Sequence, residues 1–149
     1  CGRGALLLAV LMVATASPVA AEAPASFTAA QAAAGTRAFE RYCVACHHAT
    51  LRGSAHGPPL VGKPFLSRWA GRPSAELTTF IATKMSAGIP ASEGDEVFVD
   101  LTAYIVQANG AAPGSQPLSA SSTRLLGPPD AVPTAADAGD ANAKWEGAA

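Results

Sequence analysis

The chain has 149 residues and a formal net charge of -1, which suits a single domain and gives no reason to expect a nucleic-acid partner. Ala, Gly, Pro and Ser crowd both ends, and only a middle of roughly 85 residues, from near Ser26 to near Gly110, carries an organised apolar pattern. A core of that size is small, so we expect folding to depend on a bound hydrophobic cofactor.

The first residues resemble an export signal. A basic residue precedes an apolar run at 5–14 and small residues follow, which predicts a signal peptide over 1–21 with cleavage after Ala21 or Ala23. The apolar run is short for a membrane span. We therefore expect a periplasmic protein, anchored to the membrane only if this segment is retained. Because Cys1 stands where Met would begin a chain, we also expect the sequence to be truncated at its start.

The first predicted helix covers residues 28–42. Thr28 and Gln31 match the spacing of a capping box, and the Ala-rich run that follows has high helix propensity. Gly35 and Phe39 are four residues apart and therefore share a face. A glycine inside a helix costs about 1 kcal/mol relative to alanine, so Gly35 indicates close approach of another element.

The next stretch, Cys43-Val-Ala-Cys46-His47, has the C-x-x-C-H spacing that is typical of covalent haem attachment. Each thiol can bond one vinyl group of the porphyrin, and the imidazole is then held beneath the iron. Three other interpretations are weaker. A zinc site lacks a second ligand pair, a thioredoxin-like redox pair lacks a βαβ pattern, and a disulfide across two residues would add little stability. The stretch predicts one haem c.

A proline loop and an aromatic, basic segment follow the haem motif. Residues 57–62 read Gly-Pro-Pro-Leu-Val-Gly, and residues 65–72 are punctuated by glycine and proline, with few helix signals. In the second segment Trp69 can cover a haem edge and direct its indole N–H to a propionate. Arg68 or Arg72 can pair with the same carboxylates, or each can simply be exposed to solvent.

A short helix is predicted over residues 74–83, with Ser74 as its N-cap. Leu77, Phe80 and Ile81 fall on one face of it, and we expect this face to line the haem pocket or the core.

The last predicted helix begins at the Ser92-x-x-Asp95 capping motif and ends at Asn109 and Gly110. Its apolar residues form one stripe: Val97, Leu101, Tyr104, Ile105 and Ala108. Residues 111–149 contain too few apolar side chains to offset chain entropy. We interpret them as a disordered tail or linker.

Three of these motifs, in this order, resemble class I c-type cytochromes, in particular bacterial monohaem cytochromes c similar to those that serve quinone-dependent dehydrogenases. The resemblance is carried by residues 35–47, by the G-P-x-L-x-G loop at 57–62 and by the D-L-x-x-Y pattern at 100–104. It implies an all-α cytochrome c fold with three to four short helices around one covalently bound haem. It also implies that Tyr104 packs against Gly35.

The same resemblance implies how the proximal ligand is held. The Pro58 carbonyl would accept a hydrogen bond from Nδ1 of His47, so that Nε2 faces the iron, and a ligating imidazole normally needs such a partner. The predicted cofactor-binding residues are Cys43, Cys46, His47, Pro58, Leu60, Arg68, Trp69 and Phe80, and the predicted metal ligands are His47 and Met85.

Met85 is the expected distal ligand because it is the only thioether that remains once the signal peptide is removed. His48 adjoins the proximal ligand and His56 precedes the proline loop, so neither is expected to reach the opposite face of the ring. Many bacterial members of the family have Pro directly after the ligand Met, whereas Ser86 stands here.

These features predict a periplasmic electron carrier and not an enzyme, because His/Met ligation leaves no open site on the iron. Basic residues predominate between residues 35 and 85, which would suit an acidic redox partner. The expected donor is a dehydrogenase, quinone-dependent by analogy, and the expected acceptor is an oxidase or a second cytochrome. Two alternatives stay open. One is a cytochrome subunit bound or fused to a quinone-dependent dehydrogenase, and the other is a haem enzyme or gas sensor with a dissociable Met ligand.

Overall fold

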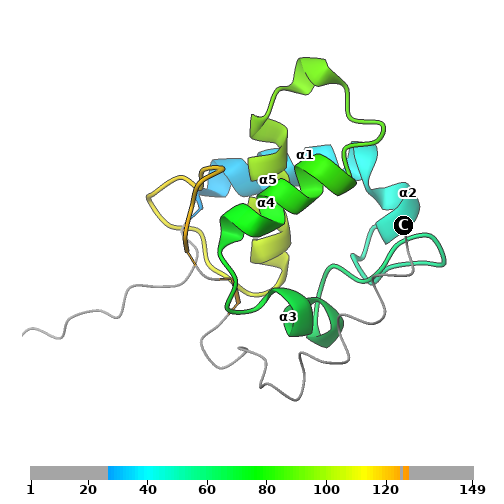
Figure 1. Cartoon of the computed structure of the whole chain (residues 1–149), viewed down its shortest axis with the longest axis horizontal. Helices are drawn as coiled ribbons and strands as arrows, with labels where there is room; N and C mark the ends of the chain where they lie inside the picture. The colour runs from blue at the N-terminus through cyan, green and yellow to red at the C-terminus, as the bar shows by residue number, and fades with distance from the viewer. Residues whose placement is uncertain (1–26, 125, 128–149) are drawn as a thin grey trace, which may run out of the picture.

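A computed structural model describes residues 27–124, 126 and 127, and these residues form an all-α fold without strands. The predicted signal peptide at 1–21 lies outside them. The helices are α1 (Ala29–Tyr42), α2 (Val44–His47), α3 (Lys63–Trp69), α4 (Ser74–Lys84), the 3-10 helix η1 (Ala91–Glu93) and α5 (Glu96–Ala108). Figure 1 shows α1 crossing α5, with α4 also against α5 and α3 below them. In the described part of the chain, none of the helices is long and apolar enough to cross a bilayer.

The predicted start of α1 is confirmed. The Gln31 N–H donates to Thr28 Oγ1 at 3.2 Å, and the Thr28 N–H donates to Gln31 Oε1 at 3.1 Å, which completes the capping box. The helix ends at Tyr42, as expected. Its buried face meets α5, and the rings of Phe39 and Tyr104 lie 5.3 Å apart. The predicted pairing of the first and last helices is therefore confirmed.

The expectation of irregular structure at residues 65–72 is wrong for its first half, because α3 covers Lys63–Trp69. Pro64 lies in the first turn of α3, where a missing N–H removes no intrahelical hydrogen bond. The proline therefore starts this helix. Phe65 and Trp69, four residues apart, form its buried face.

The two predicted caps in the second half of the domain are not formed as expected. Ser74 is the first residue of α4 and not its N-cap, and its hydroxyl donates to the Ser122 carbonyl. Ser92 lies within η1, and α5 begins at Glu96 after Asp95, which makes no side-chain cap bond. At Ser74 the hydroxyl is taken up by a contact with a distant segment, whereas the expected bond at Asp95 is simply not made.

The end of α5 at Asn109 is as predicted, but its buried surface is broader than one stripe. Ala108 is exposed, against expectation. The helix is covered on several sides, and its buried residues are Val97, Val99, Leu101, Thr102, Ala103, Ile105 and Val106.

Residues 111–124, 126 and 127, called the strap below, pack against the helices. Leu118 and Leu126 are 4% and 2% exposed. In Figure 1 the orange part of this segment lies beside the start of α1 and the start of α4. The first part of the predicted tail is thus ordered on the domain, and residues 128–149 lie outside the described residues.

Candidate functional site

One cleft brings together most of the residues singled out from the sequence. It encloses about 530 Å³ of empty space, including its part open to solvent, and side chains from α1 to α5 and the proline loop form its walls. The predicted site residues that line it are Cys43, His47, Pro58, Leu60, Trp69, Phe80 and Met85.

The helix α2 decides which parts of the haem motif face the cleft. Cys43 is the N-cap of α2 and His47 is its last residue, so the two side chains are four residues apart and share a face. Both line the cleft, and His47 is only 8% exposed. Cys46 is exposed and is not part of the lining. Cys43 and Cys46 form no disulfide with each other.

The protonation of His47 follows from its partner. Its Nδ1 lies 2.9 Å from the Pro58 carbonyl oxygen, as the family resemblance implied. A carbonyl oxygen can only accept, so Nδ1 carries the proton, and in the neutral imidazole Nε2 then has the lone pair. The imidazole is therefore held in the tautomer in which Nε2 can bind a metal.

The proline loop is held in place from both ends. A Cβ at Gly57 would lie 2.8 Å from the Cys46 carbonyl oxygen, so the loop can approach α2 this closely only with glycine there. At the other end, Asn109 Nδ2 donates to the Leu60 carbonyl at 2.9 Å, and the Gly62 N–H donates to Asn109 Oδ1 at 3.0 Å. The end of α5 thus fixes the loop that orients His47. The sequence marked Asn109 only as a helix end.

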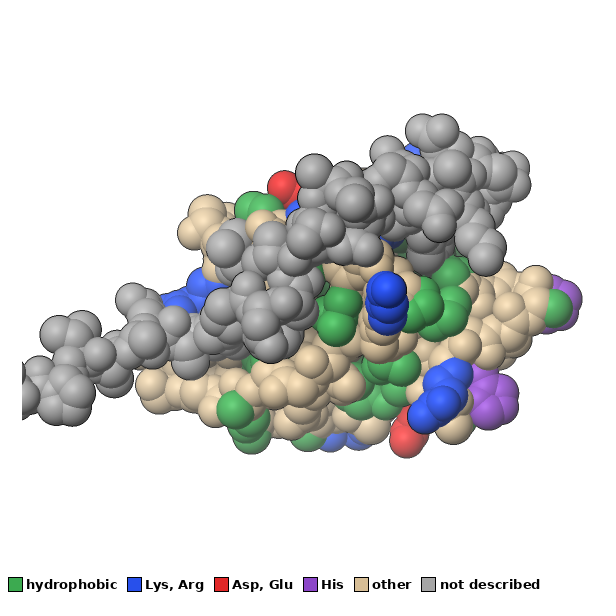
Figure 2. All heavy atoms as spheres, turned by 90° about the horizontal axis from the view of Figure 1, so that it is seen from below, with side chains coloured by type: hydrophobic (Ala, Val, Ile, Leu, Met, Phe, Trp, Pro, Cys, Tyr) green, Lys and Arg blue, Asp and Glu red, His purple; other side chains and the backbone are tan. Residues whose placement is uncertain are grey.

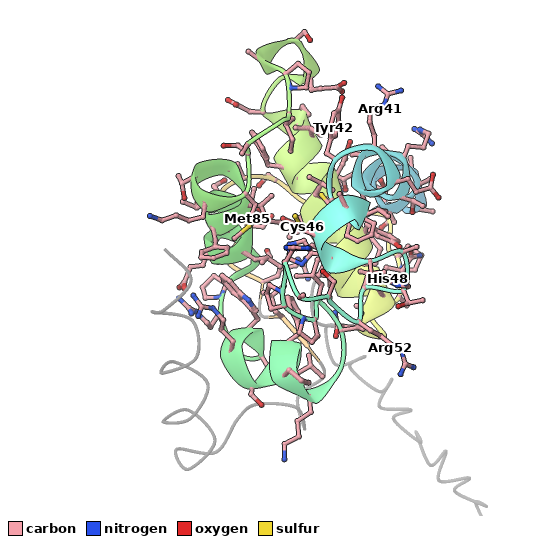
Figure 3. The ribbon with its side chains drawn as sticks, turned by 90° about the vertical axis from the view of Figure 1, so that its right-hand side faces the viewer. Arg41, Tyr42, Cys46, His48, Arg52 and Met85 are labelled. Carbon is pink, nitrogen blue, oxygen red and sulfur yellow. The ribbon has the colours of Figure 1, made fainter. Side chains whose placement is uncertain are left out.

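Met85 enters the cleft from a different helix. It is the C-cap of α4, and the residue is 38% exposed. Figure 3 shows Met85 pointing from the end of α4 toward α2, whereas His48 and Arg52 lie on the outer side of the haem motif. His48 and His56 are both exposed, and neither lines the cleft. Within the described residues, Met85 is the thioether that shares a cavity with His47.

Aromatic and basic side chains surround one edge of the cleft. The Trp69 ring lies 5.4 Å from that of Phe80 in an edge-on arrangement. The Arg68 guanidinium lies 5.5 Å from the Trp69 ring and 5.2 Å from the Phe80 ring, and Arg72 lies 4.9 Å from Trp69. Burial, and then the charge of Arg72, lower the pKa of Arg68 from its usual range.

Arg68 and Arg72 do not line the haem-motif cleft. Together with Lys84 they line a neighbouring hollow that shares Trp69 and Phe80 with it. Figure 2 shows Lys and Arg side chains beside apolar ones on the face seen from below. Of the predicted site residues, Arg68 and Cys46 are therefore the ones that the structure does not bring into the cleft.

The pKa of Cys43 argues against one of the other interpretations of the C-x-x-C-H stretch, a thioredoxin-like redox pair. Burial, and then electrostatic interaction with the neighbouring Cys46, raise the pKa of Cys43 to about 11. A thioredoxin-like redox pair needs a cysteine with a lowered pKa, because the thiolate is the nucleophile. In the part of the chain that is described, no three His, Cys, Asp or Glu side chains group as a metal site.

The residues present fit a covalently attached haem. The cleft is lined mainly by aliphatic and aromatic side chains, and it contains an imidazole with a free Nε2, a thiol four residues earlier and a thioether from another helix. Sequence reasoning did not assign Phe65, Leu101 or Ile105 to the cleft, although all three line it. Their signal was helical spacing, since Phe65 precedes Trp69 by four residues and Leu101 precedes Ile105 by four.

Comparison with known families gives a match over the middle of the chain. A family model described as "Cytochrome C oxidase, cbb3-type, subunit III" matches residues 30–105, about half of the chain. The matched residues include every side chain that lines the cleft, and the strap lies beyond them. No curated protein and no solved structure matches the chain.

Proposed function

Because this chain belongs to the family of subunit III of cbb3-type cytochrome c oxidase, a c-type cytochrome domain that transfers electrons through covalently bound haem c, we propose that it is a periplasmic electron carrier with His47 and Met85 as the axial ligands. The observation that carries the proposal is that His47, in the tautomer with a free Nε2, and Met85 line the same cleft.

Each part of the site has a role in this proposal. Cys43 and Cys46 attach the porphyrin, and Pro58 keeps His47 oriented. The aliphatic and aromatic lining excludes water from the iron, which together with a thioether ligand favours a high reduction potential. Haem c supplies a one-electron couple, and the side chains fix its ligands so that little rearrangement accompanies each electron.

The basic hollow beside Trp69 is the surface at which we expect the haem carboxylates and an acidic redox partner to interact with the domain. Arg68, Arg72 and Lys84 line it, and Glu76 contributes an acid that pairs with Arg72. We propose that Arg68 and Trp69 interact with the haem carboxylates, and that the remaining positive charge steers an acidic redox partner to this edge.

Stable membership of a larger redox complex is a second candidate, because the matching family is described as an oxidase subunit. In that case electrons still pass through the same cleft, but the domain stays bound to its partner. Purification from the native membrane and periplasmic fractions separates the two candidates. A carrier is recovered alone, and a subunit is recovered with an oxidase or a quinone-dependent dehydrogenase.

The ligation is tested by Met85→Ala in the holoprotein. The wild type should show a sulfur–iron charge-transfer band in the ferric state and little binding of carbon monoxide when reduced. Met85→Ala should lose the band, lower the midpoint potential and bind carbon monoxide readily. Ile89→Ala is the matched control, since Ile89 is partly buried in the loop after Met85 and should leave the band intact.

Two outcomes would contradict the proposal. A wild-type protein without the charge-transfer band would remove Met85 as a ligand. Haem that is extracted by acidic acetone from the wild type, to the same degree as from a Cys43→Ala/Cys46→Ala variant, would remove the covalent attachment.

A further inference from the structure

The strap is bound to the start of α1 by hydrogen bonds that use the capping box. Gln31 Nε2 donates to the Leu118 carbonyl at 2.9 Å, and the Leu118 N–H donates to Gln31 Oε1 at 2.9 Å. The Gly114 N–H donates to the Phe27 carbonyl at 2.7 Å. With Leu118 buried as well, this half of the strap is anchored by both polar and apolar contacts.

The other half of the strap caps α4. This helix starts after Pro73 without a side-chain cap, which leaves its first N–H groups without intrahelical partners. The Ser74 N–H donates to the Arg124 carbonyl at 2.8 Å, and the Ala75 N–H donates to the Ser122 carbonyl at 3.0 Å. Carbonyl groups some 48 residues away along the chain thus serve as the cap.

The turn before α4 is held by the same segment. The Gly71 N–H donates to the Leu126 carbonyl at 2.9 Å, and the Leu126 N–H donates to the Arg72 carbonyl at 2.9 Å. Leu126 is 2% exposed. The strap therefore restrains both the start of α4 and the turn that connects it to Trp69 on α3.

The opposite end of α4 carries Met85, so any movement of the helix moves the sulfur. Eleven residues make a helix of about 16 Å, and a helix of this length behaves as a stiff rod. The Thr78 and Thr102 hydroxyls, 2.9 Å apart in the interior, join its middle to α5. Beyond Met85, residues 86–95 are exposed apart from the half-buried Ser86 and Ile89, and the hydrogen bond from Tyr42 to Glu93 reaches this segment only eight residues after the methionine. Met85 is thus joined to the interior directly through α4, of which it is the C-cap, and only at a distance through Glu93.

We propose that the strap is a positioning element for Met85: by holding the start of α4 it keeps the thioether in the cleft opposite His47. This inference rests on the proposed His47 and Met85 ligation. It assigns a role to a segment that lies outside the matched family region. Loss of the strap should let α4 shift and leave Met85 off the iron in part of the molecules, while the covalently attached haem stays in place.

The test uses the full-length holoprotein with Leu118→Ala/Leu126→Ala, which removes the buried strap side chains. Two temperatures are measured, the loss of the sulfur–iron band and the loss of helical circular dichroism. In the wild type they should coincide. In the double variant the band should disappear at a clearly lower temperature than the helices, and reduced protein should bind carbon monoxide several-fold faster than wild type at the temperature of storage.

Three control proteins distinguish an effect of the buried strap residues from general destabilisation of the domain. Gln116→Ala alters an exposed strap residue and should behave as wild type. Gly35→Ala destabilises the domain at the α1–α5 contact, away from the strap, and should lower both temperatures together. A chain ending after Gly127 retains the whole strap and should keep both transitions coincident.

The outcomes separate this inference from the proposed function. Suppose that the wild type has the band. If the band and the helical signal of the double variant then disappear at the same temperature, whether lowered or unchanged relative to wild type, the strap has no positioning role. If the wild type lacks the band, the ligation itself is wrong. A double variant with too little folded holoprotein is replaced by Ser74→Ala, which removes one bond to the strap and should give a smaller shift of the band alone.

Discussion

Gly35 of α1 lies directly against the backbone carbonyl of Asp100 on α5, so close that a Cβ atom at this position would overlap the carbonyl oxygen. The nearby Cβ of Tyr104 would also be too close, at 2.8 Å. Because the Asp100 carbonyl belongs to the backbone and the Tyr104 Cβ is attached directly to it, no change of rotamer can relieve the overlap. The crossing of the first and last helices therefore depends on this glycine.

Replacing Gly35 with alanine should destabilise the holoprotein by about 1–3 kcal/mol, because overpacking outweighs the gain in helix propensity. Denaturant unfolding followed by circular dichroism measures the change. Ala33→Ser, on the exposed side of α1, is the control and should stay within about 0.5 kcal/mol of wild type. Equal stability of Gly35→Ala and wild type would mean that the helices can separate at no cost.

The second prediction concerns Tyr42, the residue before the haem motif. Its hydroxyl donates to Glu93 Oε1 at 2.5 Å, and Glu93 lies in η1 on the segment that follows Met85. This bond joins the end of α1 to the distal segment. Tyr42→Phe and Glu93→Gln should be coupled by about 0.5–1 kcal/mol in a double-mutant cycle of unfolding free energies.

The neighbouring ion pair provides the comparison for that cycle. Arg41 lies 3.6 Å from the same oxygen of Glu93, but its side chain is 71% exposed, so we expect almost no coupling between Arg41→Gln and Glu93→Gln. Additive effects of Tyr42→Phe and Glu93→Gln would show that the hydroxyl contact does not hold the segment.

The third prediction is a pH dependence at Asp100. Burial, and then the charge of Glu96, raise the pKa of its carboxyl, and Arg37 opposes the shift. A carboxyl with a raised pKa in the fold binds its proton more tightly there than in the unfolded chain. Its favourable contribution is complete below the unfolded pKa, near about 3.9, and is lost as pH rises through the folded value. At neutral pH the charged carboxylate therefore costs stability.

Asp100→Asn should be more stable than wild type at neutral pH, and the difference should vanish as pH falls toward about 4. Its backbone carbonyl, which faces Gly35, is unchanged. Unfolding by denaturant at both pH values measures the difference. Ala33→Ser, at an exposed position on α1, is the control and should show no such convergence. A variant that is less stable than wild type at neutral pH would contradict the sign.

The sequence by itself determined the parts of this protein that depend on local spacing. The capping box at Thr28 and Gln31 and the apolar face of α4 are patterns within a few residues, and each was found where it was predicted. The C-x-x-C-H motif is equally local, and of its three side chains Cys43 and His47 line the cleft. The bond from His47 to Pro58 and the pairing of Gly35 with the last helix were implied by motifs in a known order.

Only the tertiary structure decided what caps α4, where the tail packs and what fixes the proline loop. The cap of α4 and much of the strap's attachment are backbone hydrogen bonds between distant segments, and backbone groups are the same in every residue, so they leave no pattern in the side chains. The same reason explains why the strap looked like a linker, since two buried leucines among Ala, Gly, Pro and Ser are too few to signal a folded segment. Asn109 is an example of a side chain whose role the sequence did not reveal. It is typical of a helix end, and it holds the proline loop only because the fold brings the backbone of Leu60 and Gly62 within hydrogen-bond distance.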